Sequence, residues 1–308
     1  MNKPSKIHFI DPDDLAIDLA GALWELGHVV TVSCADIHSA SCAKLLTSNL
    51  LPGTSGFFPD QVTAAIDIVI ISRNIRRDNP ELKKALEIKL PVQSPEDIIL
   101  QQCIDKQRIV VIGNNSKTAI TLMMAHVLKV HHRQFDFVTS VPVPGDNRLV
   151  KISGAPVVLI EGQDVMCSFL DHTPQFIKYQ HHVGVISGIE WQSSADYPTR
   201  DAYTEAFIRF AGETPKGGIL VYVEFDPVKA VLSGVQRQDI LLVPYKTHPS
   251  SVIDGKEVLP TATRPISLKV SGKHNLQCIS AAQETLKRIG ITTDMFYEAI
   301  SSFEGIRN

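Results

Sequence analysis

The sequence has no apolar run that approaches the roughly 20 residues needed to span a bilayer. It also has no excess of positive charge, because 33 Asp and Glu outnumber 30 Lys and Arg, for a net charge of -3. This charge gives no electrostatic basis for binding nucleic acid. No apolar signal-peptide region follows the first residues, so we expect a cytoplasmic protein that associates with neither membrane nor nucleic acid.

The patterns of a disulfide framework or a histidine metal site are also missing. The five cysteines are scattered, odd in number and without a Cys-x-x-Cys pair, so we expect free thiols in a reducing compartment. Two histidine doublets, at 131–132 and 181–182, are candidate metal ligands. Neighbouring residues of a helix or strand point in different directions, so we expect neither doublet to converge on one ion.

Composition and patterning instead favour a globular protein of the α/β class. Its 308 residues are 44% hydrophobic and 20% charged, enough chain for about two domains. In the first third, short apolar runs alternate with amphipathic stretches, which predicts a parallel sheet covered by helices. Charged residues gather at 105–108, so we place a boundary there, with domains at 1–106 and 107–308.

The patterns predict the following elements. Strands are expected at Lys6–Ile10, 29–34, 66–72 and 90–93, and then at 156–160, Val183–Ile186, 218–222 and 240–244. Helices are expected at 15–26, 79–87, Pro95–Gln102, 117–129, 199–211, 275–289 and 294–303.

The segment 108–121 is the most informative part of the sequence. It predicts a buried strand, a tight turn at Gly113 and a helix opened by Lys117 and Thr118. Backbone N–H groups and a lysine hold phosphates in such a loop, and a Thr hydroxyl can ligate Mg²⁺. The residue before the lysine, normally glycine, is Ser116, which would be strained if that position requires a positive φ. A simple helix start remains the alternative.

Three other segments carry polar side chains at turns. Glu161 and Asp164 follow a predicted strand, where a parallel sheet places its active site, so Glu161 could bind Mg²⁺ with Asp164 assisting. The alternative is a pair of surface acids. His274 and Asn275 open a helix and could contact a base or cap that helix. The turn at 11–14 holds three aspartates, which would repel a diphosphate, or one of which would cap the next helix.

Together these segments resemble the Mur ligase family, in the branch that joins an amino acid or peptide to UDP-N-acetylmuramate. The resemblance runs over nearly the whole chain, and the order and spacing of the segments make it specific. The segments that carry it are Lys6–Ile10, Asn79-Pro80-Glu81-Leu82, 113–118, 160–164, 187–193, 272–275 and 302–305.

The resemblance implies a Rossmann-like domain for a UDP-sugar, then a P-loop-type central domain with a mostly parallel sheet for ATP and Mg²⁺. The family's third domain, which delivers the amine, would begin where this sequence ends and is absent from these 308 residues, either because the chain was cut there or because the protein lacks it. By resemblance, Lys117, Glu161 and Asp164 would act in an ADP-forming ligation, with Mg²⁺ on Thr118 and Glu161. The implied nucleotide contacts are Gly113, Asn115, Ser116, Lys117, Thr118, His274 and Asn275.

Departures from the family pattern leave two hypotheses. The Asp-His pair that would hold a second Mg²⁺ is Gln192-Ser193, and a second adenine-side Asn is Cys278. One hypothesis is a working ligase that acts on a UDP-N-acetylmuramate-type nucleotide and an amino acid or peptide. The other, which these losses favour, is an inactive pseudo-ligase that serves as a binding or regulatory module with a protein partner.

Overall fold

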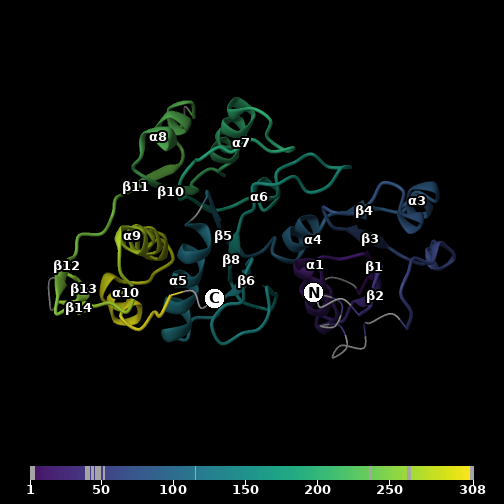
Figure 1. Ribbon diagram of the computed structural model, residues 1–308, viewed down its shortest axis with the longest axis horizontal. Helices are drawn as coiled ribbons and strands as arrows, with labels where there is room; N and C mark the ends of the chain where they lie inside the picture. The colour runs from purple at the N-terminus through teal and green to yellow at the C-terminus, as the bar shows by residue number, and fades with distance from the viewer. Residues whose placement is uncertain are drawn as a thin grey trace.

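The computed structural model describes residues 4–38, 42, 45, 50, 53–114, 116–235, 237–261 and 265–305. The strands in these ranges form a four-stranded sheet, a seven-stranded sheet and a small three-stranded sheet (Figure 1). The predicted fold class is confirmed, because the strands of the first two sheets are mostly parallel and alternate with helices.

The first sheet has the strand order β2-β1-β3-β4, and all of its pairs are parallel. Its strands are β1 (Lys6–Ile10), β2 (Val29–Ser33), β3 (Ile68–Ile71) and β4 (Val92–Gln93). The accompanying helices are α1 (Asp14–Glu25), the 3-10 turn η2 (Pro59–Gln61), α3 (Pro80–Glu87) and α4 (Pro95–Gln102). Apolar residues of β1 and β3 are buried, so the sheet is covered as a parallel sheet must be.

The second sheet has the order β11-β10-β9-β5-β8-β6-β7, in which only the edge strand β7 runs antiparallel. Its strands are β5 (Gln107–Ile112), β6 (Asp136–Val138), β7 (Val150–Lys151), β8 (Val157–Glu161), β9 (Val183–Ile186), β10 (Ile219–Val223) and β11 (Leu241–Tyr245). The helices are α5 (Lys117–Val130), α6 (Gln175–Lys178), α7 (Arg200–Gly212), α8 (Asp226–Ser233), α9 (Lys273–Lys287) and α10 (Thr293–Ile300).

The strand β5 lies at the centre of this sheet, and its apolar run is fully buried on both faces. The helix α5 that follows packs against β5 and β8 on one side and against α9 and α10 on the other (Figure 1). The start of α5 is therefore held at the carboxyl edge of the sheet, where sites form in this architecture. The small antiparallel sheet, β12 (Ser251–Ile253), β13 (Lys256–Leu259) and β14 (Ile266–Ser267), precedes α9.

Side chains connect the region of the first sheet to the region of the second. Asp97 on α4 accepts from Lys178 on α6 at 2.8 Å, and Arg73 pairs with Asp196. The guanidinium of Arg77 lies 4.7 Å from the ring centre of Phe169. The first sheet uses residues up to 93 and the second begins at 107. A domain boundary at 106 remains a prediction.

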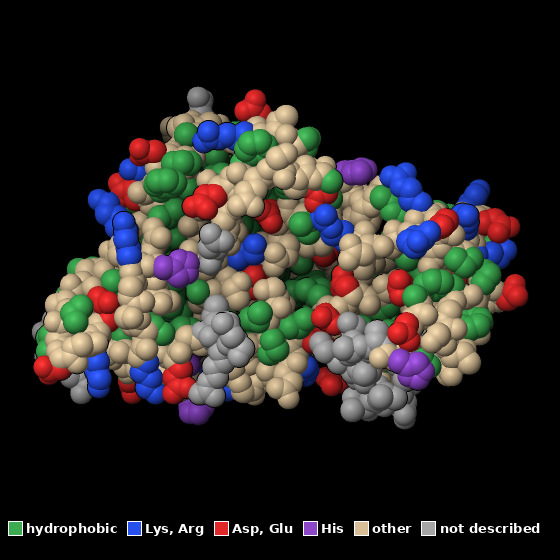
Figure 2. Space-filling view, in the orientation of Figure 1, with side chains coloured by type: hydrophobic (Ala, Val, Ile, Leu, Met, Phe, Trp, Pro, Cys, Tyr) green, Lys and Arg blue, Asp and Glu red, His purple; other side chains and the backbone are tan. Residues whose placement is uncertain are grey.

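The expectation that all cysteines are free thiols is wrong at one place. Cys34 and Cys42 are paired in a disulfide with their Cα atoms 7.1 Å apart. Cys103, Cys167 and Cys278 are free and buried. No helix among the described residues is both long and apolar enough to cross a membrane. On the face seen in Figure 2, acidic and basic side chains are mixed, in keeping with the small net charge.

Candidate active site

The phosphate-loop segment begins at a glycine that the fold requires. Gly113 follows β5 with φ at +119°, and a Cβ there would lie 2.8 Å and 2.9 Å from backbone atoms of Gly188. Ser116 has φ at -105°, an ordinary value for a residue with a side chain. The expected strain at Ser116 is therefore absent. Asn115 lies outside the described residues, so its proposed contact stays a prediction.

The helix α5 starts at Lys117 with its first turn open to an acceptor. Ser116 is the N-cap, but its side chain does not cap the helix. In the described parts of the chain, the Lys117 amine forms neither a hydrogen bond nor an ion pair. Uncapped N–H groups and the helix dipole favour an anion at this position, and a free lysine adds a full positive charge.

Thr118 and Glu161 lie together at the carboxyl ends of neighbouring strands. The Thr118 hydroxyl donates to Glu161 Oε1 at 2.7 Å, and Glu161 is only 4% exposed. The hydroxyl of Ser140, just after β6, donates to the same carboxylate at 2.8 Å, and its N–H donates at 3.1 Å. Gln163 Nε2 adds a longer contact of 3.3 Å. The structure thus brings together the two predicted Mg²⁺ ligands.

Sequence reasoning missed Ser140. It follows β6, which is too short to be recognised from a period-2 pattern, although β6 pairs with β8 directly beside Glu161. Only the strand order reveals that residue 140 reaches the end of β8.

Asp164 has a different neighbour. Its Oδ2 accepts from the Tyr203 hydroxyl of α7 at 2.8 Å. Burial, followed by the nearby Asp164 carboxylate, raises the pKa of Tyr203 well above its usual value, so the phenol remains protonated and donates. Asp164 is therefore tied to α7, and within the described residues it shares no hydrogen bond with Thr118 or Glu161.

Asn114 fastens the loop to the segment after β9. Its Nδ2 donates to the Glu190 carbonyl at 2.6 Å, and its Oδ1 accepts from the Glu190 N–H at 2.6 Å. Ser187 Oγ also donates to the Ile112 carbonyl at 2.9 Å. These contacts fix the position of the 187–193 segment relative to the end of β5. Sequence reasoning gave Asn114 no role.

A cavity of about 470 Å³ lies beside the loop. Its lining includes Asn114, Ser116, Gly188, Lys246 and His274. The exposed His274 therefore lines a cavity next to the phosphate loop, and its contact with a base stays a prediction. Asn275 is not among the lining residues, and its Nδ2 donates to the Ser271 carbonyl at 2.8 Å, within its own helix start.

Behind His274, Cys278 is fully buried on α9. Burial raises the pKa of its thiol to about 11, although a hydrogen bond with the Ser116 side chain acts in the opposite direction. The Cys278 sulfur also lies 3.8 Å from His274 Nε2. The unreactive, protonated thiol thus links the loop to the helix that carries His274.

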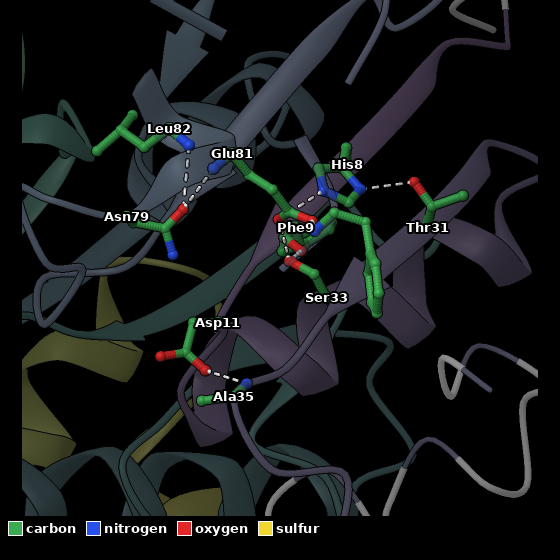
Figure 3. Close-up of polar contacts among 10 residues, drawn as sticks. His8, Phe9, Asp11, Thr31, Ser33, Ala35, Asn79, Glu81 and Leu82 are labelled. Carbon is green, nitrogen blue, oxygen red and sulfur yellow. Dashed lines mark hydrogen bonds and ion pairs between the residues drawn. The ribbon is translucent and has the colours of Figure 1, made fainter. Parts of the chain in front are cut away.

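In the acidic turn after β1, two aspartate side chains accept hydrogen bonds from backbone N–H groups. Asp11 has φ at +46°, a conformation in which glycine is favoured. Its Oδ1 accepts from the Ala35 N–H at 3.0 Å, across the ends of β1 and β2 (Figure 3). Asp13 caps α1 by accepting from the Ala16 N–H at 3.0 Å, which confirms the capping alternative. Carboxylates of the chain itself therefore occupy this helix start.

The Asn-Pro-Glu-Leu segment has a structural role. Asn79 caps α3 by accepting from the N–H groups of Glu81 and Leu82 at 3.0 Å and 3.1 Å. Glu81, 1% exposed, accepts from the hydroxyl of Ser33 and contacts His8 Nε2 at 3.3 Å (Figure 3).

Glu81 Oε1 also accepts from the Phe58 N–H at 2.6 Å. Burial alone would raise the pKa of Glu81, but hydrogen bonds with His8, Ser33 and Phe58 together lower it. The carboxylate therefore joins α3 to β1 and β2 inside the first sheet's core.

Both histidine doublets bind protein atoms. His131 Nε2 lies 2.7 Å from the Met295 carbonyl, and His181 Nε2 lies 2.8 Å from the Thr214 hydroxyl. His182 Nδ1 accepts from the Arg108 N–H at 3.2 Å. No group of three or more His, Cys, Asp or Glu side chains suited to a metal occurs in the described ranges.

Comparison with known proteins gives a consistent result. No family model matches the chain. The chain is 24% identical over 320 residues to the UDP-N-acetylmuramate–L-alanine ligase of Carboxydothermus hydrogenoformans, covering 100% of this chain and 67% of that protein. A ligase of the same name from Desulfosudis oleivorans is also 24% identical and covers 99% of this chain. The chain thus spans about two thirds of these relatives' length.

Solved structures agree in fold. The UDP-N-acetylmuramate:L-alanyl-gamma-D-glutamyl-meso-diaminopimelate ligase of Neisseria meningitides superposes with a TM-score of 0.84 at 18% identity, covering 99% of this chain and 100% of that chain. The UDP-N-acetylmuramate-alanine ligase of Thermotoga maritima gives a TM-score of 0.72 at 18% identity, covering 98% of this chain and 69% of that one. By sequence and by fold, the chain is a divergent relative of the Mur ligases.

Proposed function

We propose that this protein binds ATP with Mg²⁺ at the start of α5 and does not complete amide formation efficiently. The observation that carries the proposal is the 2.7 Å contact between Thr118 and Glu161. It places a hydroxyl and a carboxylate oxygen together beside an open helix N-terminus. Oxygen ligands of this kind are what Mg²⁺ takes from proteins, usually as one or two groups with water completing the shell.

Each residue of the proposed site has a distinct task. Lys117, whose amine has no partner in the described residues, contacts the β and γ phosphates. The backbone of Gly113 and Ser116 lines the phosphate path, and the exposed His274 side chain lies on the base side of the cavity. Asn275 supports this arrangement by holding the start of α9. When bound, Mg²⁺ supplies charge neutralisation on the phosphoryl group.

Ser140 and Gln163 refine this site. Both donate to Glu161, so they hold its carboxylate in one orientation. Asp164 orients Tyr203, which in turn lies 3.4 Å from Asn114 Nδ2. In this proposal, Asp164 positions the loop through Tyr203 and Asn114.

The site for a second substrate differs from that of an efficient ligase. Asp13 caps α1, so the helix start that would favour a diphosphate already holds a carboxylate. Asp11 adds a second negative charge at the same turn. We therefore propose that a UDP-N-acetylmuramate-type nucleotide binds weakly, which favours a binding or regulatory role.

An active ligase is the second candidate. The retention of Lys117, Thr118 and Glu161 in one cluster favours it, because these groups would stabilise charge during transfer to a carboxylate. Gln192-Ser193, in place of an Asp-His pair, would remove a second metal ligand. Stabilisation of this kind is worth several kcal/mol, or roughly a thousandfold in rate.

Calorimetric titration distinguishes these proposals. We expect Mg-ATP to bind with a dissociation constant below about a millimolar, and UDP-N-acetylmuramate to bind at least about tenfold more weakly. Release of ADP should then be measured with both nucleotides and a range of amino acids and peptides. Absence of Mg-ATP binding at millimolar concentration would disprove the nucleotide site. Rapid, amine-dependent ADP release would establish the ligase instead.

A further inference from the structure

A second polar cavity, of about 620 Å³, lies at the far end of α5 from the phosphate loop. Four basic side chains line it: Lys129, His132, Arg133 and Lys151. The helix α5 has 14 residues and rises by about 1.5 Å per residue, so the two ends are separated by roughly 20 Å. This basic cavity is therefore separate from the proposed ATP site.

Among the described residues, none of the basic side chains that line the cavity forms an ion pair. The Lys129 amine donates to the Pro144 carbonyl at 2.8 Å, and the Lys151 amine lies 6.0 Å from the ring centre of Phe135. Within the ranges that the structure describes, the side chains of Arg133 and His132 form no ion pair.

One carboxylate, Asp146, also lines the cavity. Arg148 donates to both of its oxygens at 3.0 Å, and these hydrogen bonds lower the pKa of Asp146. Asp146 is paired with Arg148 and also attracts Lys151, so the charges of Lys129, Arg133 and Lys151 still leave the cavity with an excess of positive charge in a chain whose net charge is -3. Such a local excess requires an explanation.

The end of the helix accounts for only part of this charge. A helix C-terminus carries roughly half a negative charge, which favours one nearby cation. The last carbonyls of α5 already accept from backbone N–H groups, since His131 bonds to Val127 and Arg133 bonds to Leu128. The cavity therefore holds more positive side chains than the partial negative charge of one helix C-terminus would attract.

The walls of the basic cavity are held in place. Lys106 and Asp136 form a buried ion pair at 2.9 Å, and Asp136 also accepts from the Ser153 N–H at 2.9 Å. Lys151 lies on the edge strand β7, opposite Phe137 of β6. Gly145 has φ at +79°, and a side chain there would collide with the Lys129 amine. The cavity is thus formed before any ligand arrives.

We propose that the basic cavity binds a phosphate-bearing small molecule, with the phosphate held between Arg133 and Lys151. Guanidinium groups bind phosphate oxygens in pairs, and an ammonium group adds a mobile point charge. Lys129 adds a further positive charge, His132 adds a polar ring, and Phe135 offers an apolar wall for the rest of the ligand. Binding here does not depend on the proposed ATP site.

The test uses inorganic pyrophosphate as the probe and calorimetry without Mg²⁺. The Lys117→Ala variant serves as the parent protein, because it weakens the competing phosphate loop. We expect one binding event, and Arg133→Gln/Lys151→Gln should weaken it by at least about tenfold. The matched control Lys83→Gln/Lys256→Gln removes the same charge from exposed positions and should leave the affinity unchanged.

A charge-keeping variant, Arg133→Lys/Lys151→Arg, guards against a folding defect and should retain binding. No binding by the Lys117→Ala protein at millimolar pyrophosphate would overturn the proposal. Equal binding by the neutralised variant and its control would also overturn it. Tighter binding of a single-stranded oligonucleotide than of pyrophosphate, with a steep salt dependence, would replace the small molecule with nucleic acid.

Discussion

The side chain of Ser116 lies beside the buried thiol of Cys278 and acts to lower the pKa of that thiol, so two residues that depart from the Mur ligase pattern are neighbours in the structure. Ser116 is the N-cap of α5, and Cys278 lies in α9 one turn after His274. The contact joins the phosphate loop to the helix on the base side of the cavity. The two departures are therefore coupled, which is consistent with a loop that still has a function.

Replacing Ser116 by glycine should remove this contact and leave α5 intact, because glycine is tolerated at an N-cap. The free energy of unfolding in urea should fall by only a few tenths of a kcal/mol, the usual cost of replacing an N-cap serine by glycine. Mg-ATP affinity should be unchanged or tighter. Loss of Mg-ATP binding in this variant would show that the serine itself contacts the nucleotide.

Neutralising Glu161 tests the proposed metal site. In Glu161→Gln, the affinity for Mg-ATP should fall by at least about tenfold, because the site loses a charged oxygen ligand. Binding of ATP without Mg²⁺ should not weaken, since removal of a negative charge does not disfavour phosphate. Asp105→Asn is the matched control, because it removes the same charge from an exposed position outside the proposed site. Equal losses in both variants would contradict the assignment of Glu161.

The sequence predicted the parts of the fold whose apolar pattern is continuous and local. Val183–Ile186 and Pro95–Gln102 were predicted with the observed bounds, because a buried parallel strand and a capped helix leave local patterns. The strands β6, β7 and β12 to β14 were missed. Each has two to four residues, and such short strands depend on pairing with distant segments.

In the candidate site, too, local sequence patterns predict some residues and miss those that depend on distant segments. Thr118 and Glu161 were predicted together because the segments that carry them resemble those of the Mur ligases, and in the structure they follow two paired strands of one parallel sheet. The partner of Asp164 was not predictable, because Tyr203 lies on a helix far along the chain. The close approach of Gly113 to Gly188 also joins segments far apart in the chain, which no local pattern encodes.

Glu81 should be important for stability rather than for ligand binding. Replacing it by alanine leaves His8, Ser33 and the Phe58 N–H without their shared acceptor in a buried setting. Removing one partner of a buried, hydrogen-bonded charge pair costs about 3–5 kcal/mol. The free energy of unfolding, measured by urea denaturation, should therefore fall by that amount. The control is Glu87→Ala, at an exposed position of the same helix, which should lower the free energy of unfolding only slightly. A similar small loss in both variants would contradict this role.

Glu96 should make stability depend on pH. Burial, together with Asp13 and Asp97, raises the pKa of Glu96 to about 7, and its Oε2 has no hydrogen-bond partner in the described residues. The folded protein therefore holds this proton more tightly than the unfolded chain does, so stability falls as the pH rises from about 4.5 to about 7. Above that range, folding must bury a charged carboxylate.

Glu96→Gln should accordingly stabilise the protein at pH 8 by an amount on the order of 1–3 kcal/mol and have little effect at pH 4. Thermal denaturation of both proteins across this range provides the measurement. A stabilisation that is the same at pH 4 and pH 8 would mean that the carboxyl group does not titrate in the folded protein.

Asp11→Gly tests whether the acidic turn weakens diphosphate binding. Glycine adopts a φ of +46° without the cost that a side chain incurs, which offsets the loss of the hydrogen bond from Ala35. Removing one negative charge near the start of α1 should tighten binding of UDP, measured by calorimetry, by about tenfold. The control is Asp36→Gly, an exposed acid after β2. If UDP affinity does not respond to Asp11→Gly, repulsion at this turn is not what limits binding, and Asp13, which caps α1, becomes the group to replace.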